Sequence, residues 1–176
     1  MSAIKSLVKD TAVYGLSSMT SRFLNWLLTI VYSRKLLIAE FGQMTKLYAW
    51  IALLLVILTY GMETSFFRFA NKSEHPQTVY STSLWSVGIS SLVFMVLGLL
   101  FVGDITAYLG FQANQSILIS MMIIISAMDA FAAIPLGYLR LKQRPWRFMM
   151  VRMSFVLITI ALTLGIFYGV PYLQKS

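Results

Sequence analysis

Five long apolar stretches constrain this chain more than any other feature of its sequence. Each is long enough to cross the hydrocarbon core of a bilayer, which takes about 20 residues of helix. Only 11% of the residues are charged and the mean hydropathy is +0.78, whereas soluble domains carry about 25% charged residues. We therefore predict an all-α polytopic transmembrane helix bundle, a single transmembrane domain over residues 1–176, with spans at about 11–33, 45–67, 80–102, 116–138 and 149–170.

The net charge of +8 is distributed as in a membrane protein, so we expect no nucleic-acid partner. Lysine and arginine fall mostly between the apolar stretches. If the N-terminus is cytoplasmic, nine of these residues lie inside and four outside, which fits the positive-inside rule. The inside set is Lys5, Lys9, Arg68, Lys72, Arg140, Lys142, Arg144, Arg147 and Arg152, and the outside set is Arg34, Lys35, Lys46 and Lys175.

Two prolines bear on where the last two spans begin and end. Pro135 removes a backbone donor, so we expect it to kink the fourth span or to end it near the cytoplasmic face. Pro145 suits the first turn of the fifth span.

The first span carries a polar stripe with an arginine near its middle. The polar and small residues recur at alternating steps of four and three, which places them on one face of a helix. A charge at bilayer depth inside such a stripe points to a substrate or ion path. The stripe consists of Thr11, Gly15, Ser18, Arg22, Asn25, Thr29 and Tyr32.

An arginine at a helix centre costs roughly 2.5–3.5 kcal/mol on the insertion scale, and each large aliphatic residue or Phe returns roughly 0.3–0.6 kcal/mol. The first span is therefore marginal in lipid alone, and its stripe must face other helices or a wet cavity. Arg22 fits a cationic site for an anionic headgroup, with Ser18, Asn25 and Thr29 as flanking hydrogen-bonding groups. The alternative is a buried ion pair between Arg22 and Asp129 that only joins helices.

Two carboxylates are candidates for coupling transport to a proton or sodium gradient. Asp129 lies near the middle of the fourth span, one turn after Ser126. Glu63 lies with Arg68 close to the cytoplasmic surface. The alternative there is that both side chains only reach water or headgroups, which costs little free energy.

Enzyme motifs are missing from the sequence. It has one histidine, His75, and no cysteine, so a two-histidine metal site, a disulfide and a cysteine nucleophile are excluded. There is no G-x-S-x-G turn and no glycine-rich phosphate loop. We expect no enzymatic activity, no catalytic residue, no cofactor and no metal.

Three motifs resemble polysaccharide-type flippases of the multidrug/oligosaccharidyl-lipid/polysaccharide transporter superfamily. The first lies in residues 17–24, continued by 32–36 and 40–42. The second is Tyr60-Gly61-Met62-Glu63-Thr64 with Phe67-Arg68-Phe69, and the third is residues 129–135 with Leu139-Arg140 and Arg144-Pro145. The resemblance follows the whole chain in order.

The resemblance implies a protein that moves undecaprenyl-pyrophosphate-linked oligosaccharide across the bacterial inner membrane for polysaccharide biosynthesis. It places Arg22 where related lipid II flippases carry a cavity arginine, and arginine suits phosphate oxygens. Relatives have about twelve to fourteen spans, so we expect this chain to be the N-terminal portion of one lobe, completed by further helices or a second chain. The alternatives are a multidrug exporter of the same superfamily and a non-transporting membrane partner of a polysaccharide synthase.

Overall fold

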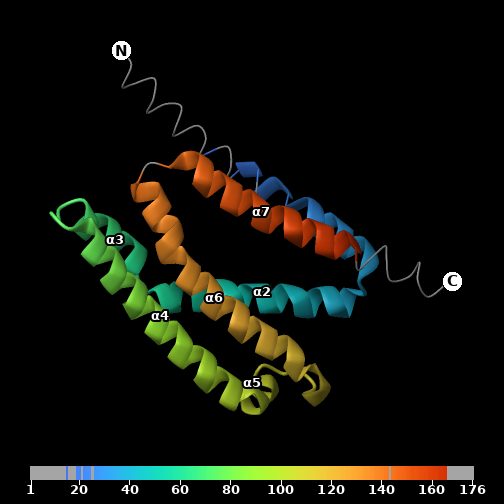
Figure 1. The fold of residues 1–176 in the computed structure, drawn as a ribbon. Helices are drawn as coiled ribbons and strands as arrows, with labels where there is room; N and C mark the ends of the chain where they lie inside the picture. The colour runs from blue at the N-terminus through green and yellow to red at the C-terminus, as the bar shows by residue number, and fades with distance from the viewer. Residues whose placement is uncertain (1–14, 16–18, 21, 25, 143, 166–176) are drawn as a thin grey trace. The chain divides into compact units, whose positions relative to one another are not determined.

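A computed structural model describes residues 15, 19–20, 22–24, 26–142 and 144–165. In this part of the chain every regular element is a helix, which confirms the all-α prediction. The elements are α2 (Ile38–Thr59), α3 (Met62–Ala70), α4 (Pro76–Leu100), α5 (Val102–Tyr108), the 3₁₀ helix η1 (Ala113–Gln115), α6 (Ser116–Leu141) and α7 (Pro145–Leu164) (Figure 1). They are preceded by a helical segment that includes residues 26–35.

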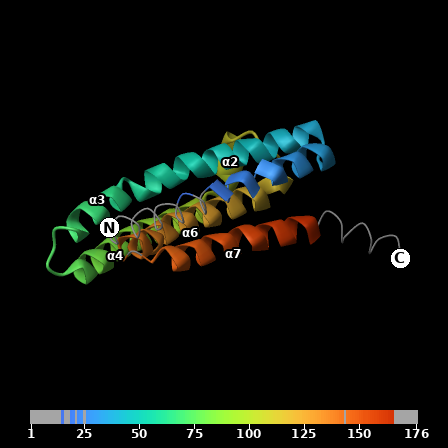
Figure 2. The same cartoon turned by 90° about the horizontal axis from the view of Figure 1, so that it is seen from above.

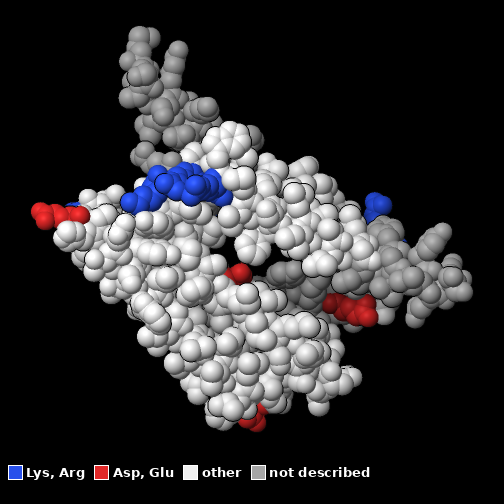
Figure 3. Space-filling view, viewed as in Figure 1, with Lys and Arg blue, Asp and Glu red and all other residues white. Residues whose placement is uncertain are grey.

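Among the residues that the structure describes, four stretches are long and apolar enough to cross a membrane, namely Ile38–Ala70, Pro76–Leu100, Ala113–Leu141 and Pro145–Leu164. They correspond to the second to fifth predicted spans. The first predicted span, 11–33, lies partly outside the described residues. Large apolar side chains such as Trp85, Leu100 and Phe101 point outward, and most of the surface drawn in Figure 3 carries no charge. Outward-facing apolar side chains are what a bilayer requires.

Several boundaries differ from those predicted. The third predicted span, α4, starts at Pro76 and not near residue 80, because proline lacks an N–H and fits the first turn. A short helix, α5, occupies part of the segment 103–115, which lies between the third and fourth predicted spans. Of the two effects predicted for Pro135, a kink or a helix end, the helix end is ruled out, since α6 continues past it to Leu141. Pro145 does open α7, as predicted.

The chain divides into two compact units. The first comprises the described parts of residues 1–41 and 142–176. Within it, the Tyr32 hydroxyl lies 3.0 Å from the Thr163 hydroxyl and links the first helical segment to α7. The backbone N–H of Leu37 donates to Glu40 at 3.1 Å, which satisfies a free donor at the start of α2.

The second unit, Gly42–Leu141, is built on the contact between α4 and α6, which lie side by side in Figure 1. Small residues on α4 allow this close approach. A methyl group added at Gly98 would lie only 2.9 Å from a side-chain carbon of Ile123. The core beside this contact consists of Leu109, Phe111, Ile119, Met122 and Ile123, with a second cluster of Leu58, Val87, Ala130 and Ile134.

The second unit contains a break between α2 and α3, inside the predicted span 45–67. Tyr60 and Gly61 both have left-handed backbone angles, with φ of 34° and 71°. The chain changes direction there in Figure 1, whereas α2 and α3 run nearly in line when seen from above in Figure 2. Glycine adopts this conformation without steric cost, whereas a bulky residue such as Tyr60 is strained by about 1–3 kcal/mol. Sequence periodicity does not detect the break, because both flanking segments are apolar.

Candidate functional site

The predicted polar stripe is only partly covered by the structure. Arg22 and Thr29 are helical residues with exposed side chains. They are seven residues apart and therefore lie on the same face of the helix. Ser18 and Asn25 fall outside the described residues. The assignment of these four residues to a substrate site stays a prediction.

Asp129 lies in the middle of α6 with an exposed side chain. Ser126, one turn earlier, is fully buried, and its hydroxyl donates to the carbonyl of Met122 at 2.8 Å. The Ser126 hydroxyl is thus used by its own helix. Arg22 and Asp129 belong to different units, so the predicted ion pair between them stays a prediction.

Glu63 has a partner that the sequence analysis did not identify. Its carboxylate forms an ion pair with the Arg140 guanidinium, which joins the first turn of α3 to the last turn of α6. The Arg140 guanidinium carbon also lies 5.5 Å from the centre of the Phe67 ring, within the range of a cation–π contact. Both charged side chains remain about 40% exposed, 41% for Arg140 and 38% for Glu63. The pair is therefore accessible to solvent or headgroups.

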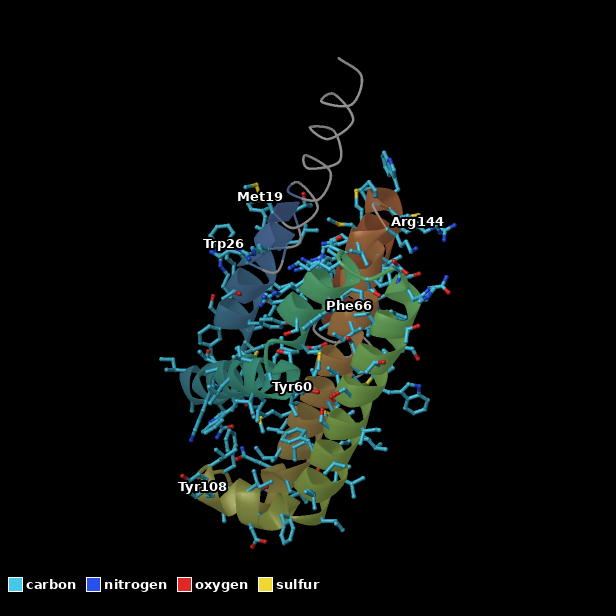
Figure 4. The ribbon with its side chains drawn as sticks, turned by 90° about the vertical axis from the view of Figure 1, so that its left-hand side faces the viewer. Met19, Trp26, Tyr60, Phe66, Tyr108 and Arg144 are labelled. Atoms are coloured by element: carbon cyan, nitrogen blue, oxygen red, sulfur yellow. The ribbon has the colours of Figure 1, made fainter. Side chains whose placement is uncertain are left out.

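Four aromatic rings beside this ion pair connect α3, α4 and α6. They belong to Phe66, Phe67, Tyr80 and Tyr138. The Tyr80 and Tyr138 ring centres are 4.4 Å apart, and the Phe66 ring lies 6.2 Å from that of Tyr80. Phe66 is almost completely buried (Figure 4). Gly137, on α6, leaves room for Phe66 and Phe67. Neither Tyr80 nor Tyr138 was predicted as a site residue, although tyrosines near helix ends are a known signal of a membrane interface.

A groove of about 490 Å³ runs between α3 and α4. Its lining is mainly apolar, with hydroxyl groups among the apolar side chains. The Tyr60 hydroxyl, at the break before α3 (Figure 4), lies 2.6 Å from the Ser86 hydroxyl and so connects the break to α4. The lining residues are Tyr60, Met62, Ser65, Phe66, Phe69, Thr78, Val79, Thr82 and Ser83.

The described residues provide groups for binding and for charge pairing. No group of three or more His, Asp or Glu side chains is placed to hold a metal ion in the segments that the structure describes. The ion pair, the aromatic rings and the groove lie in the second unit. The arginine predicted for phosphate binding lies in the first.

Comparison with known proteins supplies the family. A family described as polysaccharide biosynthesis proteins matches residues 7–174, nearly the whole chain. No curated protein and no solved structure compared with the chain matches it. The family match agrees with the helical, multi-pass architecture and with the three sequence motifs. This chain belongs to the polysaccharide biosynthesis protein family.

Proposed function

We propose that the chain is part of a flippase that moves undecaprenyl-pyrophosphate-linked oligosaccharide across the bacterial inner membrane. The observation that carries the proposal is the family match over residues 7–174 of a multi-pass helical membrane protein. Polysaccharides are assembled from precursors that must cross the membrane, and transport by two helix lobes that rock around a central site is a known solution. The spans of this chain would form part of one lobe.

In this proposal Arg22 binds the pyrophosphate group. A guanidinium offers a planar set of donors that matches phosphate oxygens. Ser18, Asn25 and Thr29 would add hydrogen bonds from the same helix face. The exposure of Arg22 makes its side chain accessible to a ligand.

Asp129 is the better of the two candidates for ion coupling. Glu63 already pairs with Arg140, so its charge is balanced by the protein. Asp129 is a carboxylate in the middle of an apolar helix, and such a residue commonly marks an ion or proton path. We propose that Asp129 exchanges a proton or sodium ion during transport.

The test is export of lipid-linked sugar in cells that lack their own flippase. The chain is expressed with and without a second polypeptide that supplies further helices, and surface polysaccharide is measured. We expect export only with the second polypeptide. Arg22→Ala should reduce this export at least tenfold, Arg22→Lys should restore little, and the protein should be present in the membrane in normal amounts.

Arg34→Ala is the matched control, because Arg34 is an exposed arginine on the same helical segment but outside the polar stripe. It should leave export unchanged. Normal export by Arg22→Ala would contradict the phosphate role. Export by residues 1–176 alone would contradict the partial-lobe proposal.

The proposed orientation places the N-terminus in the cytoplasm, residues 103–115 in the periplasm and residues 139–148 in the cytoplasm. The basis is the concentration of basic residues around the α6–α7 turn. Alkaline phosphatase fused after Tyr108, which is strongly exposed, should be active. The same enzyme fused in the turn at residues 142–145 should be inactive, and activity there would reverse the orientation.

A further inference from the structure

The short helix α3 is connected to α2 through a strained break. Tyr60 is the one non-glycine residue with a positive φ among the described residues, and Gly61 follows it in the same left-handed region. No regular helical hydrogen-bonding pattern passes unbroken through two such residues. The backbone can therefore change direction at Tyr60–Gly61 without breaking either flanking helix.

On the far side of the break, a charge pair ties α3 to α6. Glu63 is the second residue of α3, and its partner Arg140 is the second-to-last residue of α6. The Arg140 guanidinium also covers the Phe67 ring, one turn further along α3. One arginine thus contacts α3 at two successive turns, through its charge and through the face of an aromatic ring.

The flank of α3 that faces α4 borders the groove, next to the buried ring of Phe66. The groove of about 490 Å³ lies along this flank, and α3 contributes Met62, Ser65, Phe66 and Phe69 to its lining. Ser83, on the α4 wall of the groove, is only 6% exposed. Displacement of α3 from α4 would widen the groove and uncover Ser83.

We propose that α3 is a hinged segment that pivots at Tyr60–Gly61 and is latched to α6 by the Glu63–Arg140 pair. Release of the latch opens the groove between α3 and α4. Glu63 is then a positioning residue that holds α3 and not the site of ion coupling. The pair is half-exposed, so it can exchange its protein partner for water or headgroups at moderate cost.

The absence of cysteine from the sequence makes single-cysteine reporters practical. Ser83→Cys reports on the groove, and Ser126→Cys, at a fully buried position in α6, reports on the rest of the unit. The full chain is purified in detergent micelles, and the rate of N-ethylmaleimide addition is followed by mass spectrometry. We expect Glu63→Gln and Arg140→Gln each to raise the labelling rate of the Ser83→Cys reporter at least fivefold. The labelling rate of the Ser126→Cys reporter should stay unchanged.

The charge swap Glu63→Arg with Arg140→Glu should return the rate at position 83 to within about twofold of the reporter alone. Glu74→Gln, at an exposed carboxylate in the turn after α3, is the matched control and should have no effect. Unchanged labelling at position 83 in both single variants would overturn the latch. An equal rise at position 126 would show that the pair holds the whole unit together, and would overturn the hinge. Neither result depends on transport.

Discussion

The two ends of the second unit contain the same kind of contact, but the basic side chain binds a different partner at each end. At each end a basic side chain lies over an aromatic ring: Arg140 over Phe67 at 5.5 Å, and Lys46 over Phe111 at 5.2 Å. Arg140 pairs with a carboxylate that follows a break in the backbone. Lys46 instead donates to the carbonyl of Leu109, at the end of α5.

The packing of side chains also differs between the two ends. At the α5 end, Lys46 itself is exposed, but the two residues that it contacts, Leu109 and Phe111, belong to a core of nearly fully buried side chains. At the α3 end, a groove of about 490 Å³ remains between α3 and α4. A charge bound to the backbone of a packed helix is fixed by the fold, whereas a charge bound to another side chain across a break can be released. This difference supports the proposal that the α5 end of the unit is fixed and the α3 end can move.

The largest expected change in the free energy of unfolding is at the α5 end. Gly98→Ala places a methyl group 2.9 Å from Ile123, and overpacking of this kind lowers the free energy of unfolding by about 1–3 kcal/mol. Unfolding is followed by circular dichroism in mixed micelles with increasing SDS. Gly42→Ala is the control, since nothing lies within 4 Å of the added group. It should be neutral or raise the free energy of unfolding by about 0.5–1 kcal/mol. A Gly98→Ala protein as stable as Gly42→Ala would mean that the α5 end is loosely packed too.

The next effect concerns the break before α3. Gly61→Ala forces a residue with a side chain into the left-handed region and should lower the free energy of unfolding by about 1–2 kcal/mol. Gly61→Asn should cost less, because asparagine tolerates this conformation. The same SDS titration measures both. Equal stability of Gly61→Ala and the unmodified chain would contradict the left-handed turn on which the movable end depends.

The smallest effect compares the two basic residues directly. Lys46→Met removes a charged donor from a backbone carbonyl and should lower the free energy of unfolding by about 1–2 kcal/mol. Arg140→Met removes a half-exposed ion pair and should cost less than about 1 kcal/mol. Both variants keep a long apolar stem, so lost packing contributes little. A larger loss for Arg140→Met than for Lys46→Met would reverse the comparison.

The sequence was sufficient for the fold class and for four of the helices, because long apolar segments in a chain with few charges have one stable arrangement in a bilayer. It did not predict the break at Tyr60–Gly61. Glycine occurs in continuous helices as well, as Gly42 in α2 illustrates, and only the backbone angles distinguish the two cases. The effect of Pro135 was likewise left open between a kink and a helix end.

The contacts of the candidate site were predicted less completely than the fold, because the residues that meet there are far apart in the sequence. Glu63 and Arg140 were each noted, one as a coupling candidate and one for topology, but 77 residues separate them. Helical periodicity groups residues within one helix and says nothing of which helices meet. Arg22 is the converse case: the stripe in its own helix predicts the face on which it lies, which stays a prediction, and periodicity alone does not identify a partner for it on another helix.

Ligand preference tests the central claim, that this chain serves a polysaccharide flippase, most directly. Native mass spectrometry of the purified chain, together with the further helices, compares binding of an undecaprenyl-pyrophosphate oligosaccharide with that of a cationic drug. We predict binding of the pyrophosphate lipid, weakened at least tenfold, or about 1.4 kcal/mol, by Arg22→Ala and unaffected by Arg34→Ala. Preference for the cationic drug, or full binding of the lipid by Arg22→Ala, would contradict the account.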